Sequence, residues 1–285
     1  MSARLLRAVF VFIAMAVIAP PGMAQQGRAQ PPASVRLYVF DCGRLNIADI
    51  SVYQLKRDEI ATNLMSVPCF LIAHPRGNLM WDVGAVPDSA FRGNAPATLR
   101  AGTSTKTLQS QMAAIGYAPS DITHLAFSHF HWDHVGNANL FAGATWLVPQ
   151  SERELMFADP PSPRTEPANF SALKNSRTVT VGPGDYDVFG DGTVVIKPTP
   201  GHSPGHQVLF VKLARTGPVV LSGDLYHYPE ERTLKRVPTT EFNAQQTVAS
   251  RAALESFLQQ SKAQLWIEHD FNGDAKLKKA PAFYD

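Results

Sequence analysis

The sequence concentrates side chains that bind metal ions in one short stretch, AFSHFHWDHVGN, which covers residues 126–137. Four of them fall within six positions: His129, His131, Asp133 and His134. Imidazole nitrogen and carboxylate oxygen are the ligands that zinc and similar ions take in the absence of cysteine clusters. A solvated or buried histidine cluster without a metal is the alternative, but burying four such groups together without a counterpart is costly. The stretch therefore predicts part of a metal centre.

Three further candidate ligands follow short apolar segments that are typical of buried strands. His202 lies in the turn PGHSPGH, Asp224 ends the segment VVLSGD, and His269 lies in LWIEHD. A single histidine after a strand is more often structural, yet strand ends can hold such side chains rigidly. Together with the first group they provide five histidines and two aspartates, enough for two divalent ions that share a bridging carboxylate. Zinc is the expected metal, and these ligands would also accept cobalt, manganese or iron.

The elements that must position these residues alternate along the chain. Apolar segments bounded by glycine or proline predict strands, and apolar residues at helical spacing between a cap and a glycine predict helices. Strands are expected over 35–43, 69–84, 121–129, 144–149, at intervals over 176–224, and over 263–270; helices are expected over 103–116, 150–157 and 240–262. This order indicates an α/β layered fold with a sheet core.

The N-terminus has the composition of an export signal. Residues 1–24 begin with two arginines, continue with an apolar run and end in two prolines and the small-residue pattern GMA. This pattern is typical of a secretory signal peptide, with an uncleaved anchor as the alternative. Residues 25–34 are expected to be a disordered lead-in, and residues 35–285 a single domain. The mature protein is then expected in the periplasm or outside the cell, without stable membrane insertion.

The charge of the chain argues against some classes of partner. The formal net charge is +2, and the two arginines of residues 1–24 account for it, because that segment contains no acidic residue. A neutral mature chain has no general attraction for nucleic acid or anionic membranes. We therefore expect a small-molecule substrate and no nucleic-acid partner; the pattern leaves the oligomeric state open.

The two cysteines, Cys42 and Cys69, flank expected strands. Export permits a disulfide if those strands are neighbours with suitable geometry. Buried free thiols are the favoured interpretation, because cysteine packs well in a core. The spacing is not that of a CxxC motif, so neither a cysteine-based zinc site nor a thioredoxin-like site is predicted.

The order HxHxDH, PGHSPGH, SGD and a late histidine resembles the metallo-β-lactamase-fold hydrolase superfamily over nearly the whole mature chain. The resemblance implies an αββα sandwich, in which two mixed β-sheets are flanked by helices and the metal site lies at one edge of the sheets. Carried over by position, the ligands are His129, His131 and His202 for one ion, Asp133, His134 and His269 for the other, and Asp224 as the bridge. Asp82, in the turn WDVG, resembles a residue that supports the ligands.

Within the superfamily, the chain is most similar to N-acyl homoserine lactonases. The segments VPCFLIAHPRGNLMWDVG, HWDHVGNANLF and EHDFNGDAKLKKAPAFYD carry this resemblance. β-Lactamases of this fold generally lack the bridging aspartate, and thioesterases of the glyoxalase II type usually carry a helical domain after the last histidine. The RNA-processing branch has an inserted domain and basic surfaces, which are not visible here. In one departure from many lactonases, His227 replaces a tyrosine three residues after the bridging aspartate, between Tyr226 and Tyr228.

The resemblance implies that a hydroxide shared by two metal ions attacks a lactone carbonyl, with Asp133 as the proton shuttle. His227 or Tyr226 would stabilise the oxyanion, and a plain loop histidine at 227 is the alternative. The substrate pocket is expected along 45–66 and 155–175. An exported arylesterase or phosphotriester hydrolase is the runner-up, and a β-lactamase, a thioesterase or a non-catalytic metal-binding module is less favoured.

Overall fold

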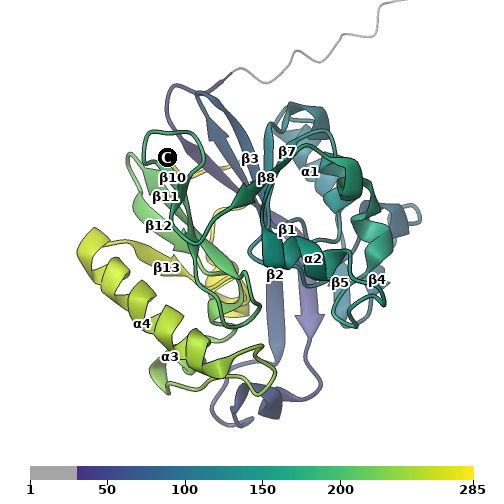
Figure 1. Ribbon diagram of the computed structural model, residues 1–285. Coiled ribbons are helices and arrows are strands. Elements are labelled where there is room, and N and C mark those ends of the chain that lie inside the picture. Colours follow the sequence, from purple (N-terminus) through teal and green to yellow (C-terminus); the bar gives the residue numbers. More distant parts are fainter. Residues whose placement is uncertain (1–30) are drawn as a thin grey trace, which may run out of the picture.

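The strands that carry the candidate ligands form two β-sheets that pack face to face between helices (Figure 1). The computed structural model describes residues 31–285, so the predicted signal peptide and most of the predicted lead-in lie outside the described residues. Within residues 31–285, no helix has the length and apolar character needed to cross a lipid bilayer. The predicted αββα sandwich is confirmed.

Both sheets are mixed. The first sheet contains, in spatial order, β4 (Ala97–Leu99), β5 (Gly102–Ser104), β1 (Arg36–Asn46), β2 (Leu64–His74), β3 (Gly77–Trp81), β6 (His124–Ala126), β7 (Thr145–Pro149) and β8 (Thr178–Val181). The second contains β13 (Gln264–Trp266), β12 (Gly217–Leu221), β11 (Gln207–Leu213), β10 (Val194–Pro198) and β9 (Tyr186–Asp187). The pairs from β3 through β8 and the pair β12–β13 are parallel, and the remaining pairs are antiparallel.

Helices cover the outer face of each sheet. In Figure 1, α1 and α2 lie beside the first sheet and α4 lies along the second. The helices are α1 (Leu108–Ala114), α2 (Gln150–Met156), α3 (Pro229–Thr233), α4 (Ala244–Ser261) and α5 (Phe271–Asp274). Short 3-10 turns are η1 (Ile50–Tyr53), η2 (Asp88–Ala90), η3 (Pro119–Asp121), η4 (Ala138–Phe141), η5 (Pro167–Asn169), η6 (Ser171–Asn175) and η7 (Gly223–Leu225).

Alternating side chains on the strands fill the apolar layers. On β1, Leu37 and Val39 are buried in the cluster between the two sheets, whereas Tyr38 and Phe40 belong to the cluster under α1. The outer face of the second sheet packs against α4, chiefly through Leu254. Burial on both faces holds the strands rigidly, so that their ends provide fixed positions for the ligands.

The predicted helices and strands are largely present. Where their boundaries differ from the prediction, contacts with distant segments set the boundary. The helix expected over 103–116 begins only at Leu108, because residues 102–104 pair with β4 as strand β5. The last strand ends at Trp266 rather than continuing to 270, so that His269 lies in the turn beyond it. The long helix α4 begins after Asn243, whose side chain accepts a hydrogen bond from the backbone N–H of Gln246 at 3.1 Å.

The expectation of two free thiols is wrong, because Cys42 and Cys69 form a disulfide. Strands β1 and β2 are antiparallel neighbours, and Phe40 lies opposite Cys69. The register shifts between Asp41 and Arg44, and this bulge brings Cys42 to a Cα–Cα distance of 5.8 Å from Cys69. The bridge lies beside Gly84, in the turn that carries Asp82: a Cβ added to Gly84 would be 2.9 Å from the Cβ of Cys42.

We expect the double variant Cys42→Ser/Cys69→Ser to unfold in urea with a free energy lower by about 3 kcal/mol, because the crosslink restricts the unfolded chain. Reducing agent should lower the stability of the unaltered protein by a similar amount and leave the double variant unchanged. Equal unfolding midpoints for the unaltered and double-variant proteins under oxidising conditions would contradict the pairing.

Candidate metal centre

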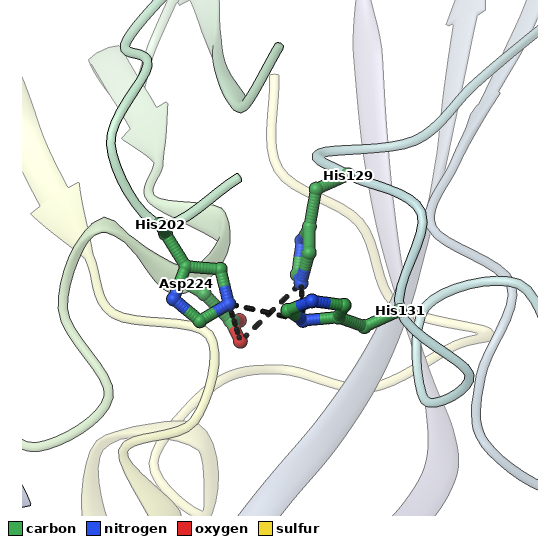
Figure 2. Close-up of side chains that lie close together, drawn as sticks. All are labelled: His129, His131, His202 and Asp224. Carbon is green, nitrogen blue, oxygen red and sulfur yellow. Dashed lines mark hydrogen bonds and ion pairs between the residues drawn. The ribbon is translucent and has the colours of Figure 1, made fainter. Parts of the chain in front are cut away.

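The structure brings all seven predicted ligands together at one edge of the sheets. The loop after β6 carries His129, His131, Asp133 and His134, and the other three follow strands of the second sheet. His202 comes after β10, Asp224 lies in η7 after β12, and His269 lies in the turn after β13. Figure 2 shows His129 and His131 on one loop, with His202 and Asp224 pointing toward them from other segments. All seven side chains are buried.

One group of ligand atoms surrounds Oδ2 of Asp224. Nε2 of His129 lies 2.6 Å from Nδ1 of His131, which in turn lies 3.0 Å from Nε2 of His202. Oδ2 of Asp224 is 3.3 Å from Nε2 of His202 and 3.6 Å from Nε2 of His129. These four atoms converge as the ligands of a single ion would.

A second group faces the other oxygen of the same carboxylate. Oδ1 of Asp224 lies 3.0 Å from Nε2 of His134 and 3.1 Å from Nε2 of His269. Oδ2 of Asp133 is 3.8 Å from the former nitrogen and 3.6 Å from the latter. Asp224 therefore presents one oxygen to each group, which is the arrangement expected of a bridging carboxylate.

The residues present fit divalent metal ions. Nε2 of His134 and Oδ1 of Asp224 are buried and make no hydrogen bond, which is costly for polar atoms without a further partner. The ligand nitrogens of His129 and His131 lie 2.6 Å apart, and two unprotonated nitrogens at this distance repel each other unless a proton or a metal ion lies between them. Nitrogen and carboxylate ligands in this number suit zinc and related ions.

The charges of the cluster shift its pKa values in opposite directions. Burial, together with the neighbouring imidazoles, lowers the pKa of His129 and of His131 well below the usual range. Burial would also lower the pKa of His134, but the carboxylates of Asp224 and Asp82 outweigh it and raise that pKa. Burial would raise the pKa of Asp224, yet the surrounding imidazoles, His269 first, hold it well below the usual range. Asp224 is thus the anionic centre of the cluster.

Comparison with known proteins identifies the family. The profile of the family described as "Metallo-beta-lactamase superfamily" matches residues 62–262 of this chain. This chain belongs to the metallo-β-lactamase superfamily. The expectation of a metal-dependent hydrolase is thereby confirmed.

Lactonases are among the similar members of the superfamily. N-acyl homoserine lactonase AttM of Rhizobium radiobacter is 30% identical over 268 residues, which are 88% of this chain and 98% of that protein. N-acyl homoserine lactonase AiiA of Bacillus thuringiensis subsp. kurstaki is 26% identical over 256 residues, 87% of this chain and 98% of AiiA. A solved N-acyl homoserine lactone hydrolase, with the product N-hexanoyl-L-homoserine bound at its catalytic metal centre, superposes with a TM-score of 0.71 at 25% identity; the match covers 88% of this chain and 99% of that one. The predicted resemblance to this branch is confirmed.

Hydrogen bonds from residues around the site orient the ligand histidines. A histidine that binds a metal through one nitrogen usually donates the N–H of the other to an acceptor. Four of the five ligand histidines have such an acceptor: Ser128 Oγ for His129 (3.0 Å), Asp82 Oδ2 for His134 (2.8 Å), Glu241 Oε1 for His202 (2.9 Å) and the Ser66 carbonyl for His269 (2.7 Å). Asp82 also accepts a hydrogen bond from the backbone N–H of Ser128 at 2.7 Å. The structure thus places Asp82 where a supporting residue is expected.

Close backbone approach explains two glycines of the site. A Cβ on Gly136 would lie 2.5 Å from the carbonyl oxygen of Gly84, so this position excludes larger residues by close packing. Gly223 precedes the bridging aspartate with φ +47°, and a Cβ there would lie 2.5 Å from the Cβ of Ser128. Its N–H donates to Glu268 at 2.9 Å. The contact at Gly136 packs the loop after β6 against the turn after β3, and the contact of Gly223 with Ser128 brings η7 against that loop, so that ligands of the two sheets meet.

Glu152 of α2 joins two loops that carry ligands, and the sequence contained no signal for it. Its carboxylate is buried and accepts hydrogen bonds from the N–H of Phe130 (2.8 Å), the hydroxyl of Ser203 (2.7 Å) and the N–H of Gly205 (2.7 Å). Phe130 lies between two ligand histidines, and Ser203 follows His202. Burial raises the pKa of Glu152, and the three hydrogen bonds oppose that shift. Nothing near position 152 in the sequence reveals contacts with residues so distant along the chain.

The structure separates the two candidates for oxyanion stabilisation. Tyr226 faces away from the ligands, with its hydroxyl donating to Glu255 at 3.2 Å and its ring under the guanidinium of Arg251. His227 lies at the site, with Nε2 3.2 Å from Oδ2 of Asp224 and Nδ1 3.1 Å from Glu231. Burial would lower the pKa of His227, but Glu231 and Asp224 raise it to about 10. His227 therefore supports the bridging carboxylate, and a direct role for it in catalysis stays a prediction.

A pocket of about 260 Å³ opens onto the ligands. Its walls include Leu45, Ile47, Val52, Tyr53 and Met65 from one of the predicted segments, and Arg164 from the other. Phe157 and Phe170, by contrast, pack edge to face with ring centroids 5.6 Å apart in the core under the first sheet. The pocket thus combines an apolar wall with a few polar groups beside the ligands, as small-molecule sites generally do.

We expect Glu152→Gln to lower the free energy of unfolding by about 2 kcal/mol, since the amide has one acceptor oxygen in place of two and its N–H₂ group leaves a buried donor without an acceptor. The matched control is Glu154→Gln on the same helix, where the side chain is exposed and accepts a hydrogen bond from Gln150 at 2.8 Å. Chemical denaturation of both variants with metal removed by chelation measures the difference. Equal midpoints for the two variants would refute the role assigned to Glu152.

Proposed function

We propose that this protein is an exported lactonase with two metal ions, which opens the ring of N-acyl homoserine lactones by hydrolysis. The observation that carries the proposal is the bridging position of Asp224, whose two oxygens face separate groups of ligands. The similarity to lactonases over nearly their whole length supports the choice of substrate. The comparisons do not favour the alternative of an arylesterase or phosphotriester hydrolase.

The residues divide into two ligand sets in the proposed mechanism. One ion would be held by His129, His131 and His202 and the other by Asp133, His134 and His269, with Asp224 shared. Divalent ions, which we propose to be zinc, supply a Lewis acid and lower the pKa of a bound water. The chain's own contribution is to hold these side chains in place and to exclude bulk solvent from them, since all seven are buried.

Asp133 is placed to move a proton. It lines the pocket, and its carboxylate is 3.6 Å from Nε2 of His269. Ring opening needs a group that takes a proton from the attacking water and returns it to the leaving alkoxide. The Asp133 carboxylate meets both the ligands and the pocket, so we assign the proton transfer to it. His227 supports Asp224 through Nε2, which lies 3.2 Å from Oδ2.

Export is part of the same proposal. The residue pattern of positions 1–24 is that of a signal peptide, and the Cys42–Cys69 disulfide is of the kind that persists in an oxidising compartment. We therefore propose that the enzyme acts in the periplasm or outside the cell.

The mature protein should contain about two divalent ions per chain by atomic emission, and Asp224→Asn should reduce this content to about one or less. Loss of the shared negative charge weakens both groups of ligands together. Asp58→Asn, an exposed position, serves as the control and should keep the full content. An Asp224→Asn protein that retains about two ions would exclude a bridging role.

Proton release on a pH-stat should be fastest with N-acyl homoserine lactones, compared with phenyl acetate, a phosphotriester and a β-lactam. Asp133→Asn should lower kcat for the lactone by about 10²–10⁴-fold, because the amide cannot accept the proton. Asp58→Asn again serves as the control, and metal content is measured for each variant. Faster turnover of the aryl ester or phosphotriester than of any lactone would replace this proposal with the alternative.

A further inference from the structure

His131 is the exception among the ligand histidines. Its Nδ1 faces the other ligands, 2.6 Å from Nε2 of His129, so its Nε2 points away from them. The other four ligand histidines direct their second nitrogen at a serine, a carboxylate or a carbonyl oxygen. The neighbour of Nε2 in His131 is instead the guanidinium of Arg164, with Nη1 at 3.3 Å.

Arg164 is held in place and has no counter-ion. Its Nη2 donates to the carbonyl oxygen of Thr240 at 2.7 Å, and the carbonyl of Arg164 accepts from the N–H of Trp132 at 2.9 Å. Within residues 31–285, no carboxylate forms an ion pair with Arg164. Arg164 and His131 both line the pocket. The pocket wall therefore contains a fixed cation whose Nη1 has, among the described residues, no hydrogen-bond partner other than this imidazole.

The chemistry of the ligand makes this contact a pair of donors. When Nδ1 of a neutral imidazole binds a cation, the proton resides on Nε2, which then only donates. A guanidinium also only donates. Neither group can accept the hydrogen bond that the other donates. His131 is only 6% exposed, so water gives little compensation. Two adjacent donors that face one pocket form a site for an acceptor oxygen.

We propose that His131 Nε2 and Arg164 Nη1 bind the amide carbonyl oxygen of the substrate's acyl chain, which makes Arg164 a specificity-determining residue. The inference rests on the proposed function. In an N-acyl homoserine lactone, only the ring α-carbon and the amide nitrogen separate the amide carbonyl from the scissile carbonyl. A substrate whose scissile carbonyl lies at the ligands thus brings the amide oxygen close to them, within the pocket that His131 and Arg164 both line. The apolar wall at Leu45, Ile47 and Met65 remains for the alkyl chain.

The test compares two lactones of equal chain length. One is N-hexanoyl homoserine lactone, and the other is α-heptyl-γ-butyrolactone, which lacks the amide. Arg164→Met should lower kcat/KM for the first by about 10- to 100-fold more than for the second, as expected for a hydrogen bond from a charged donor. Arg164→Lys should show a smaller selective loss, because it keeps the charge but not the planar fork.

Arg100→Gln is the matched control. Arg100 donates to the carbonyls of Pro163 (2.8 Å) and Thr165 (3.0 Å), on either side of Arg164. Its substitution loosens the same loop while keeping the guanidinium of Arg164. It should lower the activity toward both lactones by the same factor, and a selective loss like that of Arg164→Met would overturn the proposal.

A binding measurement separates recognition from turnover. Calorimetry with the ring-opened products, N-hexanoyl homoserine and the α-heptyl-γ-hydroxybutyrate, should show a selective rise in Kd for the amide in Arg164→Met, at unchanged metal content. Equal losses for both ligands in both assays would overturn this inference and leave lactone hydrolysis standing. A carboxylate-substituted lactone that the unaltered protein prefers over the amide would also overturn it, by assigning the site to an anion. If neither lactone is opened, the proposed function fails and this inference fails with it.

Discussion

The buried carboxylate of Asp224 is the centre on which the rest of the site depends. It lies among five imidazoles from both sheets, with one oxygen toward each group of ligands. A charge in this position is costly unless opposite charge or hydrogen bonds compensate it at close range. The imidazoles and the metal ions that they fit provide that compensation. Because the ligands come from four separate segments, compensation requires the two sheets to be held in a fixed relation.

That relation is maintained by a surrounding layer of buried polar groups. Glu152 joins the loop after β6 to the turn after β10, and Glu241 orients His202. Asp82 orients His134, and Glu231 links His227 to Arg251. Each of these groups has its own hydrogen-bond partners, so the network can be buried without leaving many polar atoms unsatisfied. The atoms left without hydrogen bonds include two that face the metal positions, which is where function requires them.

The residues that select the substrate differ from those that bind the metal. The ligand geometry is compatible with ester, lactone and phosphotriester hydrolysis, since divalent metal ions can assist all three reactions. What differs among such enzymes is the wall of the pocket, here an apolar side formed around η1 and a cationic side at Arg164. His227 lies where the resemblance implies a tyrosine, and its side chain supports Asp224. Recognition of the substrate therefore falls to residues from the loops, and the two donors at His131 and Arg164 are the polar part of it.

The sequence by itself was enough to predict the candidate ligands and the class of fold. Ligand spacing within HFHWDH is local, and the apolar strands that precede His202, Asp224 and His269 are visible as patterns, because strand periodicity and turn residues are properties of neighbouring positions. Only the tertiary structure decided the rest. The disulfide depends on a bulge in the register of β1 against β2, and Glu152 binds Ser203 across 51 positions of sequence. The position of Arg164 at His131 depends on how a loop folds over the site. Such contacts join distant segments through packing and hydrogen bonds, which leave no periodic trace in the order of the residues.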